Sequence, residues 1–176
     1  FTLATSSAYA SNAAPLGLEL GVATLDRVKQ QAGGKTRLTE TGINKYSNGR
    51  MLEGNGSGLE IDGLSNITFI FDTTDKLVGV LMKLPKQDSF GDMRNGGFLK
   101  TLAALSSKYK LVEKRVPFVG DAYAKLKQGE SIIELDAPHL SFDMEVRYMT
   151  STLQKGFMQR SSSDKAKNER NQTDKF

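Results

Sequence analysis

Apolar residues recur at helical spacing in two stretches of the chain. The first stretch lies between Thr24, a suitable N-cap, and the paired glycines at positions 33 and 34, which are typical of a helix end. Its apolar stripe consists of Leu25, Val28 and Ala32. The second stretch follows Asn95, whose side chain can cap a helix, and its stripe consists of Phe98, Leu102, Leu105 and Tyr109. We therefore predict two helices that each bury one side.

Alternation of apolar and polar residues predicts antiparallel strands. The clearest one places Ile67, Phe69 and Phe71 on one side, and residues 72–76 then form a hairpin turn. Residues 77–84 are apolar on both faces, which is typical of a central strand covered on both sides.

Weaker strand signals precede and follow this hairpin. Asn48-Gly49 predicts a type I′ turn between short strands at residues 36–41 and 50–53. The last predicted strand, residues 142–149, presents apolar side chains on one face and charged side chains on the other. The apolar side chains are Phe142, Met144, Val146 and Tyr148, and the charged ones are Asp143, Glu145 and Arg147.

The order of elements is a helix followed by several strands, and it occurs twice, in residues 16–84 and 95–149. Each helix stripe and each apolar sheet face needs a cover, so we predict an α+β fold of two tandem units, each a helix packed on an antiparallel β-sheet. A leader (1–15) precedes the first unit (16–90), and the second unit (91–160) closes with a short helix from residue 151. A disordered polar tail (161–176) follows, because it has little apolar surface to bury.

The first residues resemble the end of an export signal. Apolar residues give way to small ones, and Ala8-Tyr9-Ala10 has the A-x-A pattern that signal peptidase requires. A disordered leader rich in Ala and Ser is the alternative interpretation. The export pattern predicts a periplasmic or secreted protein, with which the absence of cysteine is compatible.

Composition excludes several classes of function. Lys and Arg number 24 against 20 Asp and Glu, for a net charge of +4, and the two signs are interspersed, so we expect no nucleic-acid partner. The chain has no Cys and a single His, His139, which excludes cysteine-based and multi-histidine metal sites. No apolar run reaches the roughly 18 residues of a transmembrane helix. We predict no metal and no cofactor.

The motifs with catalytic potential are incomplete. Residues 91–96 have the glycine spacing of a phosphate loop, but Gly97 and Phe98 stand where lysine and a hydroxyl residue are required. His139 has Asp136, Asp143 and Ser141 nearby in sequence, yet it follows Pro138 in a turn, where histidine is common. A carboxylate-only enzyme would draw on Glu130, Glu134, Asp136, Asp143 and Glu145, which more simply face water. We predict that the protein is not an enzyme.

Residues 18–28, LELGVATLDRV, resemble the opening of exported bacterial proteins in which a short strand ends in Gly and Ser or Thr caps a helix. The segment is similar to the small lipoprotein subunit of the outer-membrane barrel-assembly machine and to the beta-lactamase inhibitory protein family. The resemblance implies two tandem helix-plus-sheet units and a non-catalytic binding function. The chain departs from the first family in lacking a lipidated Cys and from the second in lacking disulfides.

Three functions follow as hypotheses. The first is an exported binding module for an envelope or secreted protein, with loops and one sheet face as its contact surface. Its predicted partner-binding residues are Tyr46, Arg50, Phe118 and Tyr123, since aromatic and arginine side chains dominate interface energetics. The second is a carrier of a small apolar molecule or lipid, held in a cavity lined by residues 77–84 and 98–109. The carboxylate-only enzyme is the third.

Overall fold

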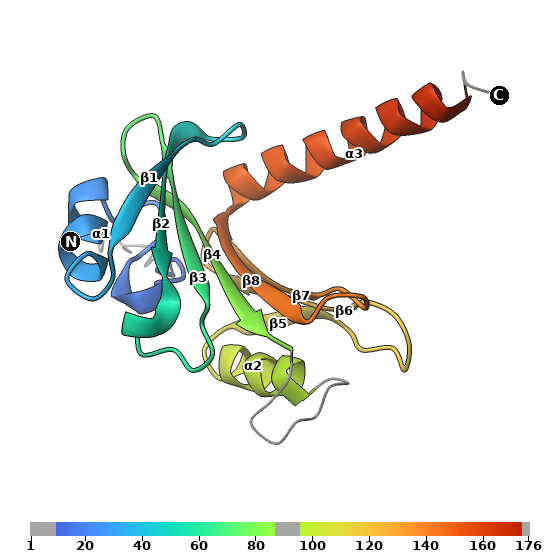
Figure 1. The fold of residues 1–176 in the computed structure, drawn as a ribbon, viewed down its shortest axis with the longest axis horizontal. Helices are drawn as coiled ribbons and strands as arrows, with labels where there is room; N and C mark the ends of the chain where they lie inside the picture. Colours follow the sequence, from blue (N-terminus) through green and yellow to red (C-terminus); the bar gives the residue numbers. More distant parts are fainter. Residues whose placement is uncertain (1–9, 87–95, 174–176) are drawn as a thin grey trace, which may run out of the picture.

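The computed structural model describes residues 10–86 and 96–173, and its strands form one antiparallel sheet of eight in the order β1-β2-β3-β4-β8-β7-β6-β5 (Figure 1). In that order the strands are β1 (Leu38–Ile43), β2 (Asn48–Asn55), β3 (Asn66–Asp72), β4 (Leu77–Pro85), β8 (Asp143–Thr150), β7 (Ser131–Ala137), β6 (Ala122–Gln128) and β5 (Lys110–Arg115). The α-helices are α1 (Leu25–Ala32), α2 (Gly96–Ser106) and α3 (Ser151–Thr173), and the short 3-10 turns are η1 (Pro15–Gly17) and η2 (Gly56–Gly58).

The predicted pair of tandem helix-on-sheet units is wrong, because the two sets of strands form one continuous sheet. Strand β4 pairs with β8 over seven positions, from Gly79 opposite Met149 to Pro85 opposite Asp143. A strand that is apolar on both faces needs a neighbour on each edge, and β8 supplies the second one. The buried side chains that result form one main cluster running from Ala13 to Tyr148. The predicted boundary between residues 90 and 91 lies outside the described residues.

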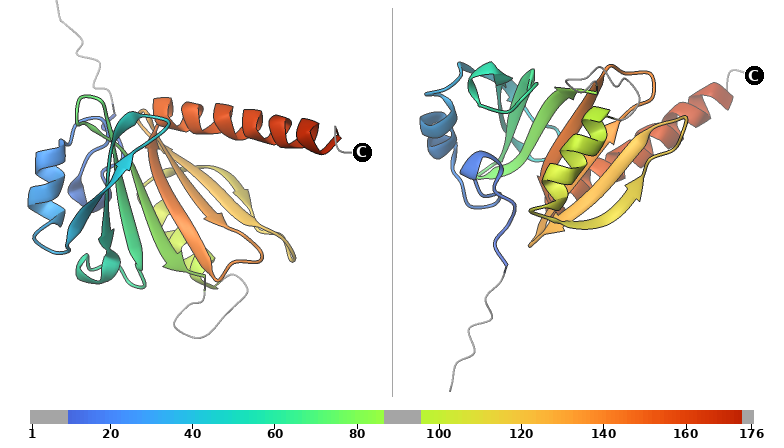
Figure 2. Two further views of the ribbon diagram at one scale, coloured as in Figure 1. Left: turned by 45° about the horizontal axis from the view of Figure 1, so that its top comes forward. Right: turned by 90° about the horizontal axis from the view of Figure 1, so that it is seen from below.

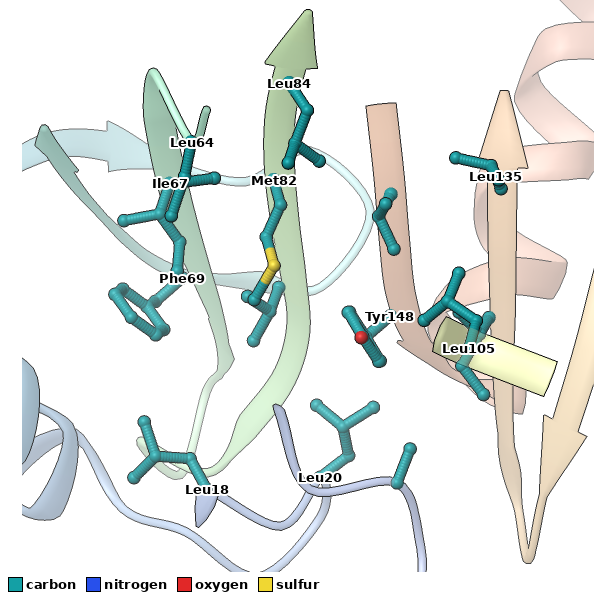
Figure 3. Packing of buried hydrophobic residues seen from close by; sticks show 14 of the residues in the cluster. Leu18, Leu20, Leu64, Ile67, Phe69, Met82, Leu84, Leu105, Leu135 and Tyr148 are labelled. Carbon is teal, nitrogen blue, oxygen red and sulfur yellow. The ribbon is translucent and has the colours of Figure 1, made fainter. Parts of the chain in front are cut away.

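Helices α1 and α2 contribute to this main cluster, which lies on one face of the sheet (Figure 2). The first predicted stripe is confirmed, because Leu25, Val28 and Ala32 are buried in α1, and the second is confirmed for Phe98, Leu102 and Leu105, which are buried in α2. Tyr109 lies past the end of α2 and is half-buried against the main cluster, so its place in the helix was predicted wrongly. From the sheet, Ile67, Phe69 and Phe71 are fully buried against them, as their alternation predicts (Figure 3). The Thr24 side chain accepts a hydrogen bond from the Arg27 N–H at 3.3 Å, so this cap is confirmed as well. Asn95 lies outside the described residues.

The reversal between β1 and β2 differs from the predicted Asn48-Gly49 turn. The chain turns over residues 44–47, and the Asn48 N–H donates to the Asn44 carbonyl at 2.8 Å. The Asn44 side chain supports this turn by accepting hydrogen bonds from the Tyr46 and Ser47 N–H groups. The Asn48-Gly49 pair instead begins β2: Asn48 has a φ of 56°, and a Cβ on Gly49 would lie 2.1 Å from the Phe71 carbonyl oxygen.

Two further predictions are wrong at the C-terminal end. Phe142 lies outside β8 and is 79% exposed, because the strand begins at Asp143 and its inward-facing residues begin at Met144. Helix α3 continues to Thr173, well past the predicted end at residue 160. Residues 161–173 contain neither Gly nor Pro, so local propensity permits a helix where tertiary packing does not require one.

The two outermost strands share two features. Each of β1 and β5 has only one neighbour, and each pairs with it through a register shift, at Glu40/Gly42 in β1 and at Leu111/Glu113 in β5. All six residues of β5 are exposed. The interior of the fold is therefore built by the six inner strands, and the edges project into solvent.

Candidate binding surface on the uncovered sheet face

The second face of the sheet is covered only where α3 begins. Leu153, in the first turn of α3, packs against Ile70 and Met149 in a small separate cluster. Met51, Val78 and Leu81 are among the half-buried side chains beside it. Beyond this point α3 extends away from the sheet, and most of the face has no helix over it (Figures 1 and 2).

Residues directly opposite each other on neighbouring strands lie on the same face of the sheet. The strand register therefore arranges the side chains of this face in rows that run across the strands. The row beside the start of α3 is apolar from β7 to β2, where it consists of Ile132, Met149, Gly79, Ile70 and Met51, and it continues to Lys127 of β6 and Lys110 of β5. The next row consists of Glu113, Lys125, Glu134, Arg147, Leu81, Thr68 and Glu53. The third consists of Arg115, Tyr123, Asp136, Glu145, Lys83, Asn66 and Asn55. In the second and third rows, ionic side chains gather over β8, β7 and β6.

Arg147 is the centre of this surface and contacts three carboxylates. Its guanidinium lies 3.3 Å from Glu134, 3.1 Å from Asp136 and 3.7 Å from Glu145. The Arg147 side chain is 16% exposed and that of Glu134 only 5%. We call Arg147, Glu134, Asp136 and Glu145 the arginine cluster. It holds one positive charge against three negative ones.

The inner carboxylate of the cluster is fixed from several sides. Glu134 accepts hydrogen bonds from the Tyr123 hydroxyl at 3.1 Å and from the Gln154 amide of α3 at 3.4 Å. Arg147 also lies over the ring of Phe157, 5.6 Å from its centroid. Its Nε–H is buried without a hydrogen-bond partner among the described residues, although Glu134 is close by. The start of α3 therefore holds the inner half of the cluster in place.

The outer carboxylates are less well compensated. Asp136 and Glu145 stand directly opposite each other on β7 and β8, an arrangement that like charges disfavour. Burial raises the pKa of Glu145 and the Asp136 charge adds to that rise, whereas the charges of Arg147 and Lys83 oppose it. Burial also raises the pKa of the Tyr123 phenol, and the neighbouring Glu134 carboxylate raises it further. Tyr123 consequently stays a neutral hydrogen-bond donor.

The structure distributes the four predicted partner-binding residues over several places. Tyr123 lies on the uncovered face, and Tyr46 packs edge-to-face on Phe157 with the ring centroids 5.3 Å apart. Phe157 also contacts Arg147, so Tyr46 lies next to the arginine cluster without belonging to it. Arg50 instead pairs with Asp75 at 3.6 Å in the β3–β4 turn.

Phe118 lies at one end of the sheet, in the loop between β5 and β6, and is 90% exposed. Leu140 and Phe142, in the β7–β8 loop, are also highly exposed. The two loops are linked, because the His139 N–H donates to the Asp121 carboxylate at 2.6 Å. Phe118 is thus separate from the arginine cluster.

Sequence reasoning missed Arg147, the central residue of the surface. Alternation in the last strand places Arg147 on the water-facing side, and that much is correct. Its importance comes from the partners that β7 brings beside it, and strand order cannot be derived from alternation within one strand. Only the register in which β7 pairs with β8 places Glu134 directly opposite Arg147, and this register would have been needed to predict their contact.

Four of the five carboxylates considered for catalysis, Glu134, Asp136, Asp143 and Glu145, are engaged in ion pairs. Asp143 pairs with Lys83 at 2.9 Å, and Asp136 binds Arg147, so neither orients the His139 ring among the described residues. Over residues 10–86 and 96–173, no three or more His, Asp and Glu side chains are grouped so that they could hold a metal ion. The arrangement is suited to charge recognition.

Comparisons with protein-family models, with curated proteins and with solved structures find no match to this chain. The resemblance to the two exported bacterial families therefore stays a prediction. Among the helices in the described part of the chain, none is long and apolar enough to cross a membrane.

Proposed function

We propose that the protein is a non-enzymatic binding module that receives a protein partner on the uncovered face of its sheet. The observation that carries the proposal is the arginine cluster, in which one guanidinium is shared by three carboxylates on an otherwise open surface. Burying an ion pair stabilises a fold little, because the cost of removing both charges from water offsets their attraction. A cluster that served stability alone would therefore be expected to have equal numbers of positive and negative charges. Within the cluster the carboxylates outnumber the guanidinium, although Lys125 stands opposite Glu134 and Lys83, which pairs with Asp143, stands opposite Glu145. The two outer carboxylates of the cluster are the groups that a cation of the partner would contact.

The chemistry of the surface defines the partner's contact residues. A lysine or arginine side chain that reached Asp136 and Glu145 would relieve their mutual repulsion. The Tyr123 ring beside them is fixed by its hydrogen bond to Glu134, and Arg115 lies over it, 5.8 Å from its centroid. The partner is therefore a protein that presents a basic residue next to an apolar one, the combination typical of an interface hot spot.

We also propose that the protein works outside the cytoplasm, in the periplasm or after secretion. The support is the Ala8-Tyr9-Ala10 pattern and the absence of cysteine. Cell fractionation followed by N-terminal sequencing tests this part. A mature chain that begins at Ser11 in the exported fraction is the expected result, and recovery from the cytoplasm with residues 1–10 attached would contradict it.

Site-specific photo-crosslinking tests the binding face directly. A benzophenone amino acid replaces Lys125, beside Glu134 on the uncovered face, and in a control chain it replaces Lys29 on α1. Irradiation in the source cells is expected to give an adduct of one defined mass from position 125 and none from position 29.

Charge variants then test the chemistry of the contact. Asp136→Asn with Glu145→Gln in the position-125 chain is expected to abolish the adduct, because the partner's cation loses both carboxylates. Asp26→Asn with Glu40→Gln changes the net charge equally at exposed positions elsewhere and should leave the adduct intact. Equal adducts from positions 125 and 29, or an adduct insensitive to Asp136 and Glu145, would overturn the proposal.

A further inference from the structure

A cleft opens on the helix-covered side of the sheet, opposite the face proposed for the protein partner. It has a volume of about 540 Å³, within the range of small-molecule sites. Met82 of β4 and Val146 and Tyr148 of β8 line it where the two strands pair, and Figure 3 shows Met82 and Tyr148 at this place. The cleft therefore lies over the centre of the sheet, between the parts of the fold that α1 and α2 cover.

The walls of the cleft come from regions that are far apart in the sequence. On one side lie residues 14–18 and the segment from Leu59 to Ile61, together with the end of α1. On the other side lie Ala104 and Leu105 of α2. Lining side chains are mainly apolar, so the cleft can receive an aliphatic chain.

Tyr148 contributes a phenol hydroxyl to the cleft, whose lining also includes the polar side chains of Gln31, Thr101 and Tyr109. The residue is 7% exposed, and among the described residues its hydroxyl has no hydrogen-bond partner. The ring of Tyr109 meets that of Tyr148 edge-to-face, with 6.1 Å between centroids. Tyr148 lines the cleft, so its hydroxyl is placed to donate a hydrogen bond to an acceptor atom of a ligand there.

The rim of the cleft carries an uncompensated cation. Lys108, one turn after Ala104, has no ion-pair partner among the described residues. Lys35 on the opposite rim pairs with Glu60 at 3.6 Å, so the local balance is one positive charge. The cleft thus combines a mainly apolar interior, a tyrosine hydroxyl that can donate a hydrogen bond and a positive rim.

We propose that this cleft binds an amphipathic monoanion with an aliphatic body, of the class of long-chain carboxylates. The chain lies on Met82, Val146 and Leu105, and the anionic group meets the Lys108 ammonium at the rim. The Tyr148 hydroxyl donates to an oxygen of the ligand. This sharpens the carrier hypothesis: of residues 77–84 only Met82 lines the site, whereas the region of residues 101–109 supplies one of its walls.

Dodecanoate is the probe, titrated into the full chain by isothermal calorimetry, with dodecanol as its uncharged counterpart. We expect saturable binding of one dodecanoate with a Kd below about 1 mM, the range of weak specific sites, and weaker binding of dodecanol. Ala104→Trp fills the cleft and is expected to abolish binding. Ala103→Trp is the matched control, because Ala103 is an equally exposed neighbour on α2 that does not line the cleft.

Two further variants separate the polar contacts. Tyr148→Phe removes only the hydroxyl and is expected to weaken dodecanoate binding about fivefold, the value of one hydrogen bond, without lowering the unfolding temperature. Lys108→Glu is expected to weaken binding at least as much, whereas Lys110→Glu, on exposed β5, leaves it unchanged.

The assignment is overturned if dodecanoate shows no saturable binding, or if Ala104→Trp and Ala103→Trp bind it equally. Equal affinity for dodecanol, or no effect of Lys108→Glu, would overturn the anionic ligand class. These outcomes are independent of the photo-crosslinking result, since the crosslinker and the charge variants lie on the other face.

Discussion

The two faces of the sheet are built from the same strands but by different rules. On the helix-covered face, neighbouring strands present Leu52, Phe69, Val80 and Tyr148, all buried, one beside the other. On the opposite face the row beside α3 is apolar from β7 to β2 and ends in Lys127 and Lys110, and the rows farther along the strands carry charge near their centre. The difference teaches that side chains of the sheet are apolar where a helix packs on them and polar where none does. The rows without a helix over them are therefore the part of the sheet available for recognition.

The largest effect on stability is expected from a substitution in the core on the helix-covered face. Phe69→Ala removes a fully buried ring from the main cluster and should lower the free energy of unfolding by about 3–5 kcal/mol. Urea denaturation followed by circular dichroism measures the loss. A loss below about 1 kcal/mol would mean that this face is not the main core.

A smaller effect is expected from the arginine cluster on the other face. Arg147→Met leaves the buried Glu134 carboxylate without its cation and should cost about 3 kcal/mol. The double variant Arg147→Met with Glu134→Gln removes both charges and should recover most of that loss, which a double-mutant cycle in urea quantifies. If both variants are equally unstable, packing of Arg147 on Phe157 matters more than its charge.

The smallest expected effect concerns the outer carboxylate and has the opposite sign. The pKa of Glu145 in the folded protein lies above the ordinary value of 4.5, so the native state retains its proton longer than the unfolded state does. Its stabilising contribution is complete below pH 4.5 and is lost as pH rises through the folded pKa. Glu145→Gln should therefore stabilise the protein slightly at neutral pH.

Thermal melts from pH 4 to pH 8 test this sign. The wild type should lose stability relative to Glu145→Gln as pH rises above about 4.5, the unfolded-state value. Glu53→Gln, on the same face but far from Arg147 in its row, is the control and should show no such difference. A Glu145→Gln variant that is less stable at neutral pH would show that its contact with Arg147 outweighs burial and the Asp136 charge.

Local pattern was enough to predict most elements of the fold. The stripes of α1 and α2 and the alternation in β3 follow from periodicities that each segment carries within itself. Continuity of the sheet could not be predicted in this way, because the pairing of β4 with β8 joins segments about 65 residues apart and depends on tertiary packing. The Asn48-Gly49 turn failed for a similar reason, since Asn44 outcompetes it with its side-chain hydrogen bonds.

The candidate sites were predictable only in part. Tyr123 was chosen for its residue type and lies on the uncovered face, yet its partner Glu134 comes from the neighbouring strand. The cleft depends on residues near positions 16, 60, 104 and 148, which no motif connects. Both sites arise from which strands and loops become neighbours, and this information lies outside any single segment.

The bulged outer strands have a consequence for how molecules of this protein behave at high concentration. A sheet of eight with two free edges offers two rows of unsatisfied backbone groups, onto which a second molecule could add strand upon strand. Irregular pairing at Gly42 and near Glu113 distorts the hydrogen-bonding template at both ends, and Lys110, Lys114 and Arg115 surround one of them with charge. Fibril growth by edge addition is thereby opposed at both ends, and contact with other proteins is directed to the broad surfaces of the sheet.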